Sequence, residues 1–470
     1  MGLMYLASLL RQDHRKTEIF DADVEAWTLQ QTVRKIIEKN PPIVGFSVFQ
    51  RALPSLELIV RNLREKGYTG HITCGGITPT LSHSYMSEKI GDFVDSIVLG
   101  EGENTLRQLT DRILTGQNWE TLPGIAYLKR DSNIQVVNTP IDFIDLDTLP
   151  FAARDYLEFC LGKTNYATMM GSRGCYGVCT FCSNFSFENF HPGPRWRSRN
   201  PISVVDEMQD LFESRGITVF KFNDPNIFGP GNKGRDHVKH ICTELIHRNL
   251  KFHLMGFCRG DDITKDPSIV NELKAAGFER LLIGVESANN EILDRFRKLE
   301  TIEGMDQALA ILHNAGISTV LGFMIFNPYT TIDTLKTDLA FLRRRGDVYP
   351  TLCKALRIFD GTPIQTLMEK EGRLIPKNPF EGYHDYVMPK DVAAIYALMK
   401  VLFVNCLDKI RAAGQEKIWG VKKSDSFRDR QDFNSLAEGF FTIESFLSLP
   451  PRTCVVRNLS HNERTAMGHV

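Results

Sequence analysis

Between residues 164 and 374, short apolar segments alternate with amphipathic helical segments in six successive units. The expected strands are rich in Val, Ile, Leu and Phe and lie at 166–170, 219–223, 252–257, 280–285, 319–326 and 352–359. The expected helices lie at 203–214, 235–248, 268–276, 289–297, 304–315 and 331–344. Strands that alternate with helices form a parallel sheet. Six units are too few for a closed eight-stranded barrel, so the pattern predicts a partial (β/α)6 barrel with ligands at the carboxyl ends of its strands.

The first 140 residues show a second, shorter alternation of the same kind. Strands are expected at 16–20, 43–48, 71–74 and 96–99, with helices at 29–38, 55–66 and 105–114 and a hairpin at 124–137. This spacing predicts an α/β fold with a doubly wound, Rossmann-like parallel sheet. We therefore expect four regions: an N-terminal domain at 1–140, an acidic linker at 141–163, the partial barrel at 164–374 and a C-terminal helical region at 375–470. In the last region, helices are expected at 391–412 and 433–447.

The composition excludes some classes of protein. The 470 residues carry a formal net charge of −1, whereas nucleic-acid binders usually have a strong basic excess. No apolar run approaches the roughly 20 residues that span a bilayer, so neither a nucleic acid nor a membrane is expected as a partner. The first residues lack the basic start of a signal peptide and the pattern of a myristoylation signal. The sequence therefore predicts a cytoplasmic protein.

Three of the ten cysteines lie close together directly after an expected strand. Cys175, Cys179 and Cys182 follow the spacing C-x3-C-x2-C on a glycine-rich loop. Three thiolates on one loop can bind three irons of a [4Fe-4S] cluster and leave the fourth iron open to an outside ligand. The alternative is a zinc site completed by His191, although zinc sites usually show paired short spacings, and this sequence has a single group.

This loop, with the aromatic Phe181 just before its last cysteine, resembles the signature of the radical S-adenosylmethionine (SAM) enzymes. Further segments resemble landmarks of the subgroup that carries an N-terminal cobalamin-binding-type domain, and they lie at 100–103, 146–151, 197–199, 284–287 and 361–363. The resemblance covers about residues 1–375. It implies that a [4Fe-4S] cluster cleaves SAM to a 5′-deoxyadenosyl radical, with a small molecule as substrate and an electron donor such as flavodoxin or ferredoxin.

Candidate SAM contacts follow from the resemblance and from the strand ends. Phe181 is expected near the adenine. Asp224 ends the second barrel strand and is either near the methionine amino group or a turn cap before a proline. Arg259 follows the third strand, where it could pair with the methionine carboxylate or form a surface ion pair. Glu286 ends the fourth strand as a carboxylate that needs a partner, and Ser287 beside it is either a contact or a helix N-cap.

Whether cobalamin binds is left open by the sequence. Ser47, Gly75, Gly76 and Gly100 are the positions that could line the slot for its tail at the carboxyl edge of the N-terminal sheet. No Asp-x-His-x-x-Gly motif occurs. Residues 1–7 resemble the stretch that follows the first strand in related proteins, so we expect that strand to be missing. The domain is therefore either a cobalamin site or a degenerate form of one.

The leading hypothesis is a radical SAM enzyme that modifies a carbon centre of a small metabolite or natural-product precursor. With cobalamin, the expected reaction is methyl transfer. Without it, the reaction would be a dehydration, oxidation or epimerisation, for instance of an aminosugar. A different class is an iron–sulfur electron carrier without substrate chemistry. The turn at 326–331 departs from the family pattern, and Asn327 and Tyr329 there either face the substrate or lie in a surface turn.

Overall fold

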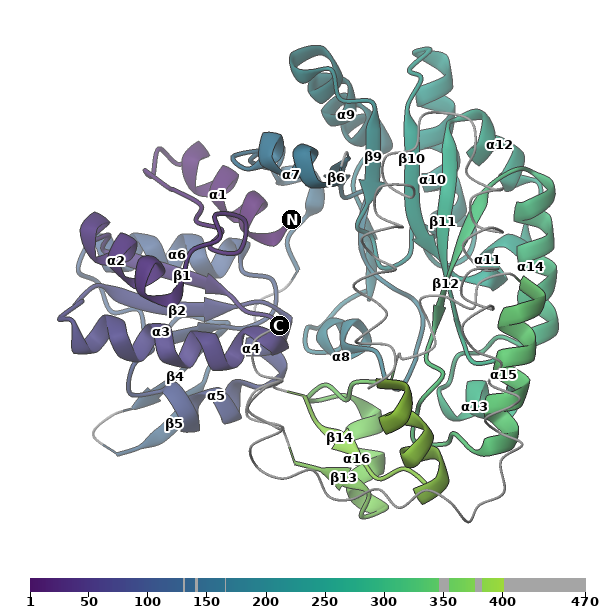
Figure 1. Ribbon diagram of the computed structural model, residues 1–470. Helices are drawn as coiled ribbons and strands as arrows, with labels where there is room; N and C mark the ends of the chain where they lie inside the picture. Colours follow the sequence, from purple (N-terminus) through teal and green to yellow (C-terminus); the bar gives the residue numbers. More distant parts are fainter. Residues whose placement is uncertain (130–131, 140–142, 165, 346–354, 377–382, 401–470) are drawn as a thin grey trace. The chain divides into compact units, whose positions relative to one another are not determined.

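The computed structural model describes residues 1–129, 132–139, 143–164, 166–345, 355–376 and 383–400. The described part contains two five-stranded sheets and two short two-stranded sheets (Figure 1). Both large sheets belong to one compact unit of the chain. Among the described residues, no helix combines the length and apolar character that crossing a bilayer requires.

The N-terminal sheet has its strands in chain order. These are β1 (Ile43–Ser47), β2 (His71–Gly75), β3 (Ser96–Val98), β4 (Ile125–Lys129) and β5 (Ile134–Val137). The first three are parallel, and β4 and β5 form the predicted hairpin, antiparallel to β3. The prediction of a strand at 16–20 is wrong, because this segment forms neither a strand nor a helix. The carbonyl of Thr17 instead accepts hydrogen bonds from the guanidinium of Arg11.

Helices cover both faces of this sheet, which confirms the doubly wound prediction. They are α1 (Gly2–Gln12), α2 (Leu29–Lys39), α3 (Leu53–Glu65), α4 (Ile77–Leu81), α5 (His83–Ile90) and α6 (Glu103–Leu114), with a 3-10 turn η1 (Gln50–Ala52). A capping box between Thr28 and Gln31 starts α2. Apolar residues of α2, α3 and α5 pack on one face of the sheet, whereas α6 packs on the other face against Val98 and Ile125.

The second large sheet is parallel throughout and forms the predicted partial barrel. Its strands, in spatial order, are β12 (Ser318–Phe323), β11 (Phe278–Glu286), β10 (His253–Cys258), β9 (Val219–Phe222) and β6 (Ala167–Met169). For the sixth expected strand, 352–354 lie outside the described residues. Ala355 makes a parallel bridge with Phe326 just beyond β12, which is where a sixth strand would continue the sheet.

Burial alternates along these strands and separates the two faces of the sheet. Phe220, Leu254 and Leu281 are fully buried, whereas their neighbours Lys221 and Leu282 stay partly accessible. The buried face is covered by helices α9 (Pro201–Arg215), α10 (Gly231–His247), α11 (Gly260–Lys265), α12 (Ile269–Ala275), α14 (Ile302–Asn314) and α15 (Ile332–Arg345) (Figure 1). The short helix α13 (Asn290–Arg295) instead contributes Ile292 to a separate hydrophobic cluster with Ile358 and Ile364. The other face is the interior of the partial barrel, and the strand ends above it carry the candidate site.

The remaining elements join and extend the two sheets. They are η2 (Leu146–Thr148), α7 (Leu157–Thr164), β7 (Ser172–Gly174), α8 (Ser183–Glu188), β8 (Trp196–Ser198), α16 (Pro363–Lys370), β13 (Leu374–Ile375) and β14 (Asp385–Tyr386). Residues 391–400 are helical, as expected for the first part of 391–412. The rest of that helix and the helix expected at 433–447 lie outside the described residues. The division into four regions stays a prediction.

Candidate cluster and cofactor site

The cysteine loop connects β7 and β8, the two strands of a short hairpin. Gly174 is the last residue of β7, pairs with Trp196 and has φ +80°. A β-carbon at this position would overlap the carbonyl oxygen of Arg195, so only glycine fits the turn. Cys175 follows at once, and Cys182 stands at the N-cap of α8. The sequence therefore places all three cysteines between two fixed elements.

The three thiols lie in a low-dielectric setting. Cys179 is buried and the other two are half-buried. Burial raises the pKa of all three thiols, that of Cys182 to about 12, while the charges of Lys298 and Arg259 act in the opposite direction on Cys175 and Cys179. The backbone N–H of Gly177 donates to the Cys175 sulfur at 3.3 Å. Buried thiols beside cations fit an anionic iron–sulfur cluster, because metal binding removes their protons and the cations balance the charge that remains.

The donor set does not fit a zinc ion. In the described part of the chain, no three His, Cys, Asp or Glu side chains converge on a point where one metal ion could sit. A cubane does not need such a point, since each thiolate binds a different iron. His191, the proposed fourth zinc ligand, is buried elsewhere. Its Nε2 accepts the backbone N–H of Glu101 at 3.1 Å, and its ring packs on Phe143.

Arg259 ties the cysteine loop to the end of β10. Its Nη1 lies 3.9 Å from the Cys179 sulfur, and its guanidinium lies 5.3 Å from the ring centre of Tyr176. Its Nε donates to Asp261 at 2.9 Å and its Nη2 donates to the Lys298 carbonyl at 2.6 Å. The surface ion pair that we considered as the alternative is therefore a buried one beside the cluster loop. Binding of the methionine carboxylate by Arg259 stays a prediction.

Glu286 ends β11 within a buried group of charges. It has φ +69° at a bulge in the β11–β12 pairing. Its carboxylate lies 3.7 Å from the Lys298 ammonium, which also lies 3.2 Å from Glu300. Burial raises the pKa of Glu286, against the pull of Lys298. The Glu300 oxygen that faces Lys298 also lies 3.4 Å from a guanidinium nitrogen of Arg259, so two buried cations balance the carboxylates at this strand end.

Ser287 and Phe181 each contact other residues of the protein. The Ser287 hydroxyl donates to Asp338 at 3.1 Å and accepts the N–H of Asn289 at 3.2 Å. The Phe181 ring packs edge-on against Phe296, with ring centres 5.1 Å apart, as part of a hydrophobic cluster. Their roles toward SAM stay predictions.

Asp224 braces the turn that leads into the cysteine loop. Its two carboxylate oxygens accept the N–H of Gly171 at 3.0 Å and the hydroxyl of Ser172 at 2.7 Å. Burial raises its pKa to about 6, despite both hydrogen bonds. The turn at 326–331, which follows β12, differs from the family pattern. In it, the side-chain oxygen of Asn327 accepts the N–H of Tyr329, so Asn327 stabilises the turn. The Tyr329 hydroxyl is buried without a partner.

The four candidate cobalamin positions differ in what lies over them. Ser47 is exposed, and a β-carbon on Gly76 would meet only Ser47 and Val48, at 3.7 Å or more. Gly75 is similarly free, with Val98 as its neighbour at 3.5 Å. Gly100, in contrast, lies directly under the ring of His191. The side of the slot formed by Ser47 and Gly76 therefore has room for the tail of a bound cobalamin, whereas the His191 ring covers the side at Gly100.

Two sets of functional candidates were missed by the sequence reasoning. Lys298 was not singled out, because a lysine directly after an expected helix is usually exposed. Arg173 pairs with Glu103 at 2.6 Å, and Arg197 pairs with Glu101 at 2.5 Å. Glu101, Glu103 and Arg197 lie in segments that resemble family landmarks, and Arg173 lies just before the first cysteine. Their opposite charges were the signal that could have indicated the pairing.

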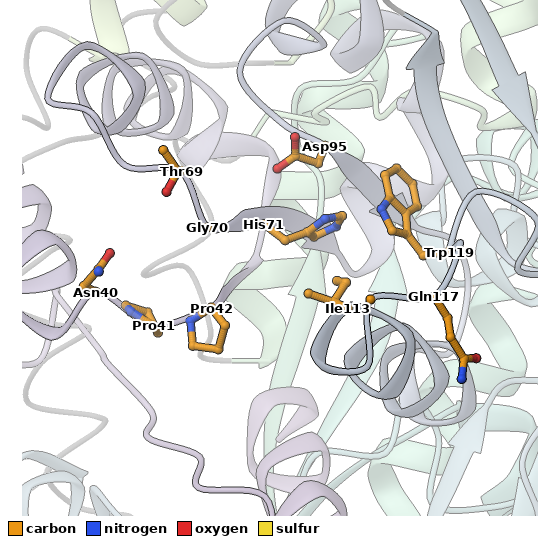
Figure 2. Close-up of a pocket in the computed structure, with 11 residues that line it drawn as sticks. Asn40, Pro41, Pro42, Thr69, Gly70, His71, Asp95, Ile113, Gln117 and Trp119 are labelled. Carbon is orange, nitrogen blue, oxygen red and sulfur yellow. The ribbon is translucent and has the colours of Figure 1, made fainter.

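A pocket of about 620 Å³ lies at the opposite, amino edge of the N-terminal sheet (Figure 2). It is lined by Asn40, Pro41, Pro42, Thr69, Gly70, His71, Asp95, Ile113, Gly116, Gln117 and Trp119. His71 packs edge-on against Trp119 (Figure 2), and burial lowers its pKa to about 4. The pocket adjoins the starts of β1 and β2, so it is separate from the candidate slot at their carboxyl ends.

Comparison with known families agrees with this geometry. The family model of the Radical SAM superfamily matches residues 169–342, and that of the B12 binding domain matches residues 1–110. The chain therefore carries a radical SAM domain and an N-terminal B12-binding domain. The superfamily implies a [4Fe-4S] cluster and SAM as cofactors.

Individual relatives share about a quarter of their residues with this chain. The anaerobic magnesium-protoporphyrin IX monomethyl ester cyclase of Synechocystis sp. is 25% identical over 67% of this chain and 62% of its own length. The 4′-phospho-dehydrooxetanocin synthase of Priestia megaterium is 27% identical over 72% of this chain and 47% of its own. The chain thus spans only about half to three fifths of these two relatives.

Solved structures share the fold. The cobalamin-dependent SAM radical enzyme OxsB with aqua-cobalamin bound superposes with a TM-score of 0.76, at 21% identity, over 93% of this chain and 68% of that one. The radical SAM methyltransferase TsrM of Kitasatospora setae gives 0.64, at 19% identity, over 79% and 72%. The predicted combination of a Rossmann-like sheet and a partial barrel is confirmed.

Proposed function

We propose that this protein uses a [4Fe-4S] cluster on Cys175, Cys179 and Cys182 to cleave SAM and to modify a carbon centre of a small metabolite. The observation that carries the proposal is the cysteine loop itself. It is held rigidly between β7 and α8, its central thiol is buried, and a guanidinium lies 3.9 Å from that sulfur. An electron carrier would not need the partly accessible barrel face and the buried carboxylates at its strand ends.

When bound, the cluster supplies one electron that splits SAM into methionine and a 5′-deoxyadenosyl radical, which abstracts a hydrogen atom. The residues of this chain hold and orient the reactants. Glu286 and Asp224 present carboxylates toward the amino group or ribose. Arg259 presents a cation toward the carboxylate, and Phe181 a ring toward the adenine. The edge-on contact with Phe296 orients the Phe181 ring.

The proposal includes cobalamin in the N-terminal domain and methyl transfer as the reaction. The match of residues 1–110 to the B12-binding model and the open Ser47–Gly76 side support it. Two further relatives are named as methylases acting on hopanoids. The second candidate is a cobalamin-independent dehydration, oxidation or epimerisation, which the coverage of Gly100 by His191 favours.

We further propose the four regions given above as domains and a flavodoxin or ferredoxin as the electron donor. Cysteines spread through the described chain are all free. Free thiols are usual in the reducing cytoplasm, which is the location we propose.

Iron content and SAM cleavage test the central proposal. Anaerobically reconstituted protein should bind about four irons per chain and release 5′-deoxyadenosine when reduced with SAM. Replacing the three cysteines together by Ala should abolish both. Cys242→Ala, at a buried cysteine of α10, is the control and should leave both in place. A triple variant that keeps its iron would show that the ligands are elsewhere.

Cobalamin binding is tested separately. Protein reconstituted with hydroxocobalamin should retain one corrin per chain through gel filtration, seen in its absorption spectrum. Retention would favour methyl transfer from labelled SAM. Loss of the corrin, with 5′-deoxyadenosine still formed, would favour the cobalamin-independent reaction.

A further inference from the structure

Lys298 lies at a backbone segment that bends twice. After α13, the N–H of Arg297 donates to the Asp294 carbonyl and the N–H of Lys298 donates to the Leu293 carbonyl, both at 2.9 Å. This pair of bonds is a Schellman ending, in which glycine usually takes the left-handed position. Here Arg297 takes it with φ +50°, and Leu299 follows in the same region with φ +58°. Two bulky residues therefore hold a conformation that costs each of them about 1–2 kcal/mol.

The double bend buries the side chain of Lys298 and exposes that of Leu299, which is the reverse of the usual preference of these residue types. Lys298 is 4% exposed, whereas Leu299 next to it is 73% exposed. Lysine is among the residues least often buried, and leucine is among those most often buried. Backbone strain persists where the surroundings enforce it, and it gathers at functional sites. The segment thus keeps an ammonium inside the protein at the expense of an apolar contact.

The buried ammonium is linked to the cysteine loop. It lies 3.2 Å from Glu300 and 3.7 Å from Glu286. The Lys298 carbonyl accepts the Arg259 guanidinium at 2.6 Å, and that guanidinium lies 3.9 Å from the Cys179 sulfur. The charges of Lys298 and Arg259 both act on Cys179.

A second link fixes the same segment against the loop. The Phe296 carbonyl accepts the N–H of Thr180 at 2.9 Å. Thr180 directly follows Cys179, so the distance between the ammonium and the cluster ligands is set by backbone as well as by side chains.

We infer that Lys298 is a positioning residue of the cluster site, whose fixed buried charge favours the reduced form of the cluster. Reduction adds one electron, from the low-potential donor, to a cluster that three thiolates already make negative. A cation in a low-dielectric site stabilises the more negative form, and an anion there opposes it. Lys298 therefore raises the reduction potential and Glu300 lowers it. The inference rests on the proposed function, since it requires that cluster.

Redox titration of the reconstituted full-length protein, followed by EPR without SAM, tests the signs of these effects. For Lys298→Met, the ratio of reduced to oxidised cluster at a given potential should fall about tenfold, which is a shift of about 59 mV to more negative potential. Lys298→Arg should stay near the wild type. Glu300→Gln should shift the potential the opposite way. The control Lys336→Met, at a 56% exposed side chain on α15, should change nothing because solvent screens it.

The double variant Lys298→Met/Glu300→Gln restores the net charge, so its potential should return toward that of the wild type. If Lys298 and Glu300 had only a structural role, the two substitutions would not shift the reduction potential in opposite directions and cancel when combined. The inference is overturned if Lys298→Met binds four irons at an unshifted potential, or if both single variants shift in the same direction. If Lys298→Met fails to hold a cluster, Glu300→Gln alone decides, and an unshifted potential overturns the inference. A wild-type protein without iron would instead overturn the proposed function, and this inference with it.

Discussion

Glu286 is a carboxylate within a buried group of charges at the end of β11, and its contact with SAM is a prediction. We predict that Glu286→Gln, which keeps the shape and removes the charge, raises the dissociation constant for SAM about tenfold, equivalent to about 1.4 kcal/mol. Iron content should stay at the wild-type level, because the residue is not a cluster ligand. Equilibrium dialysis with SAM measures this. Glu291→Gln, on the exposed side of α13, is the control, and an unchanged constant for Glu286→Gln would leave that residue a structural role only.

Asp338 gives a prediction about pH. The residue is fully buried, one of its oxygens accepts Ser287 and Ala288, and the other has no partner. Burial raises its pKa from 3.8 to about 7. The folded state therefore holds this proton more tightly than the unfolded state does, so stability conferred at low pH is lost as the pH rises from about 4 to about 7.

Asp338→Asn should remove that dependence, because the neutral amide resembles the protonated acid. Between pH 5 and 6, where the folded state keeps the proton and the unfolded state has lost it, the unfolding free energy of the wild type should fall relative to that of the variant by about 1.4 kcal/mol per pH unit. Urea unfolding at several pH values measures the difference. Asp333→Asn, at an exposed position on the same helix, should behave like the wild type. Parallel pH curves for wild type and Asp338→Asn would contradict the assignment.

Single residues differ in how far the sequence can identify them. The cysteines are found from spacing alone, since their ligand geometry is local. Glu286 is found because a carboxylate stands out at the end of an apolar strand. Lys298 is not, since its burial depends on two left-handed residues that leave no mark in the sequence when neither is glycine.

Among the elements, the β7–β8 hairpin carries the cysteine loop and depends on Gly174. We predict that Gly174→Ala reduces iron incorporation several-fold although all three cysteines remain. An alanine at φ +80° costs about 1–2 kcal/mol in backbone strain, and its β-carbon would also overlap the Arg195 carbonyl. Iron analysis and thermal unfolding measure the effect. Gly162→Ala, in α7 where a β-carbon meets nothing within 4 Å, is the matched control, and equal iron content in both variants would refute this role for the hairpin.

The strands that the sequence predicted correctly are those whose apolar residues face a core. The five barrel strands and three N-terminal strands alternate or run apolar, and neighbouring strands and helices bury them. The segment 16–20 has only two apolar residues, Ile19 and Phe20, after three polar ones, and side-chain donors satisfy its backbone instead. The strand β7 escaped prediction because its residues, Ser172, Arg173 and Gly174, include no apolar side chain that could show a period.

For the whole molecule, buried ion pairs are among the contacts that join the N-terminal domain to the β7–β8 hairpin. Glu101 and Glu103 follow β3, whereas Arg173 and Arg197 lie on β7 and β8, and all four side chains are at most 15% exposed. Although burial acts to raise it, the two guanidiniums hold the pKa of Glu101 below its ordinary value. Removing one partner of a buried pair typically costs about 3–5 kcal/mol, so these pairs couple the N-terminal domain to the hairpin that carries the cluster loop.

We therefore predict that the double variant Glu101→Gln/Glu103→Gln loosens the hairpin without unfolding either sheet. Amides of β7 and β8 should exchange with deuterium at least about tenfold faster, equivalent to about 1.4 kcal/mol of local stability, while amides of β1 and β11 stay at the wild-type rate. Hydrogen exchange with mass spectrometry resolves these segments. The control Glu88→Gln/Glu120→Gln removes two exposed carboxylates from the same domain and should leave all rates unchanged. Equal protection of the hairpin in both double variants would mean that packing around His191, rather than the ion pairs, holds the two domains together.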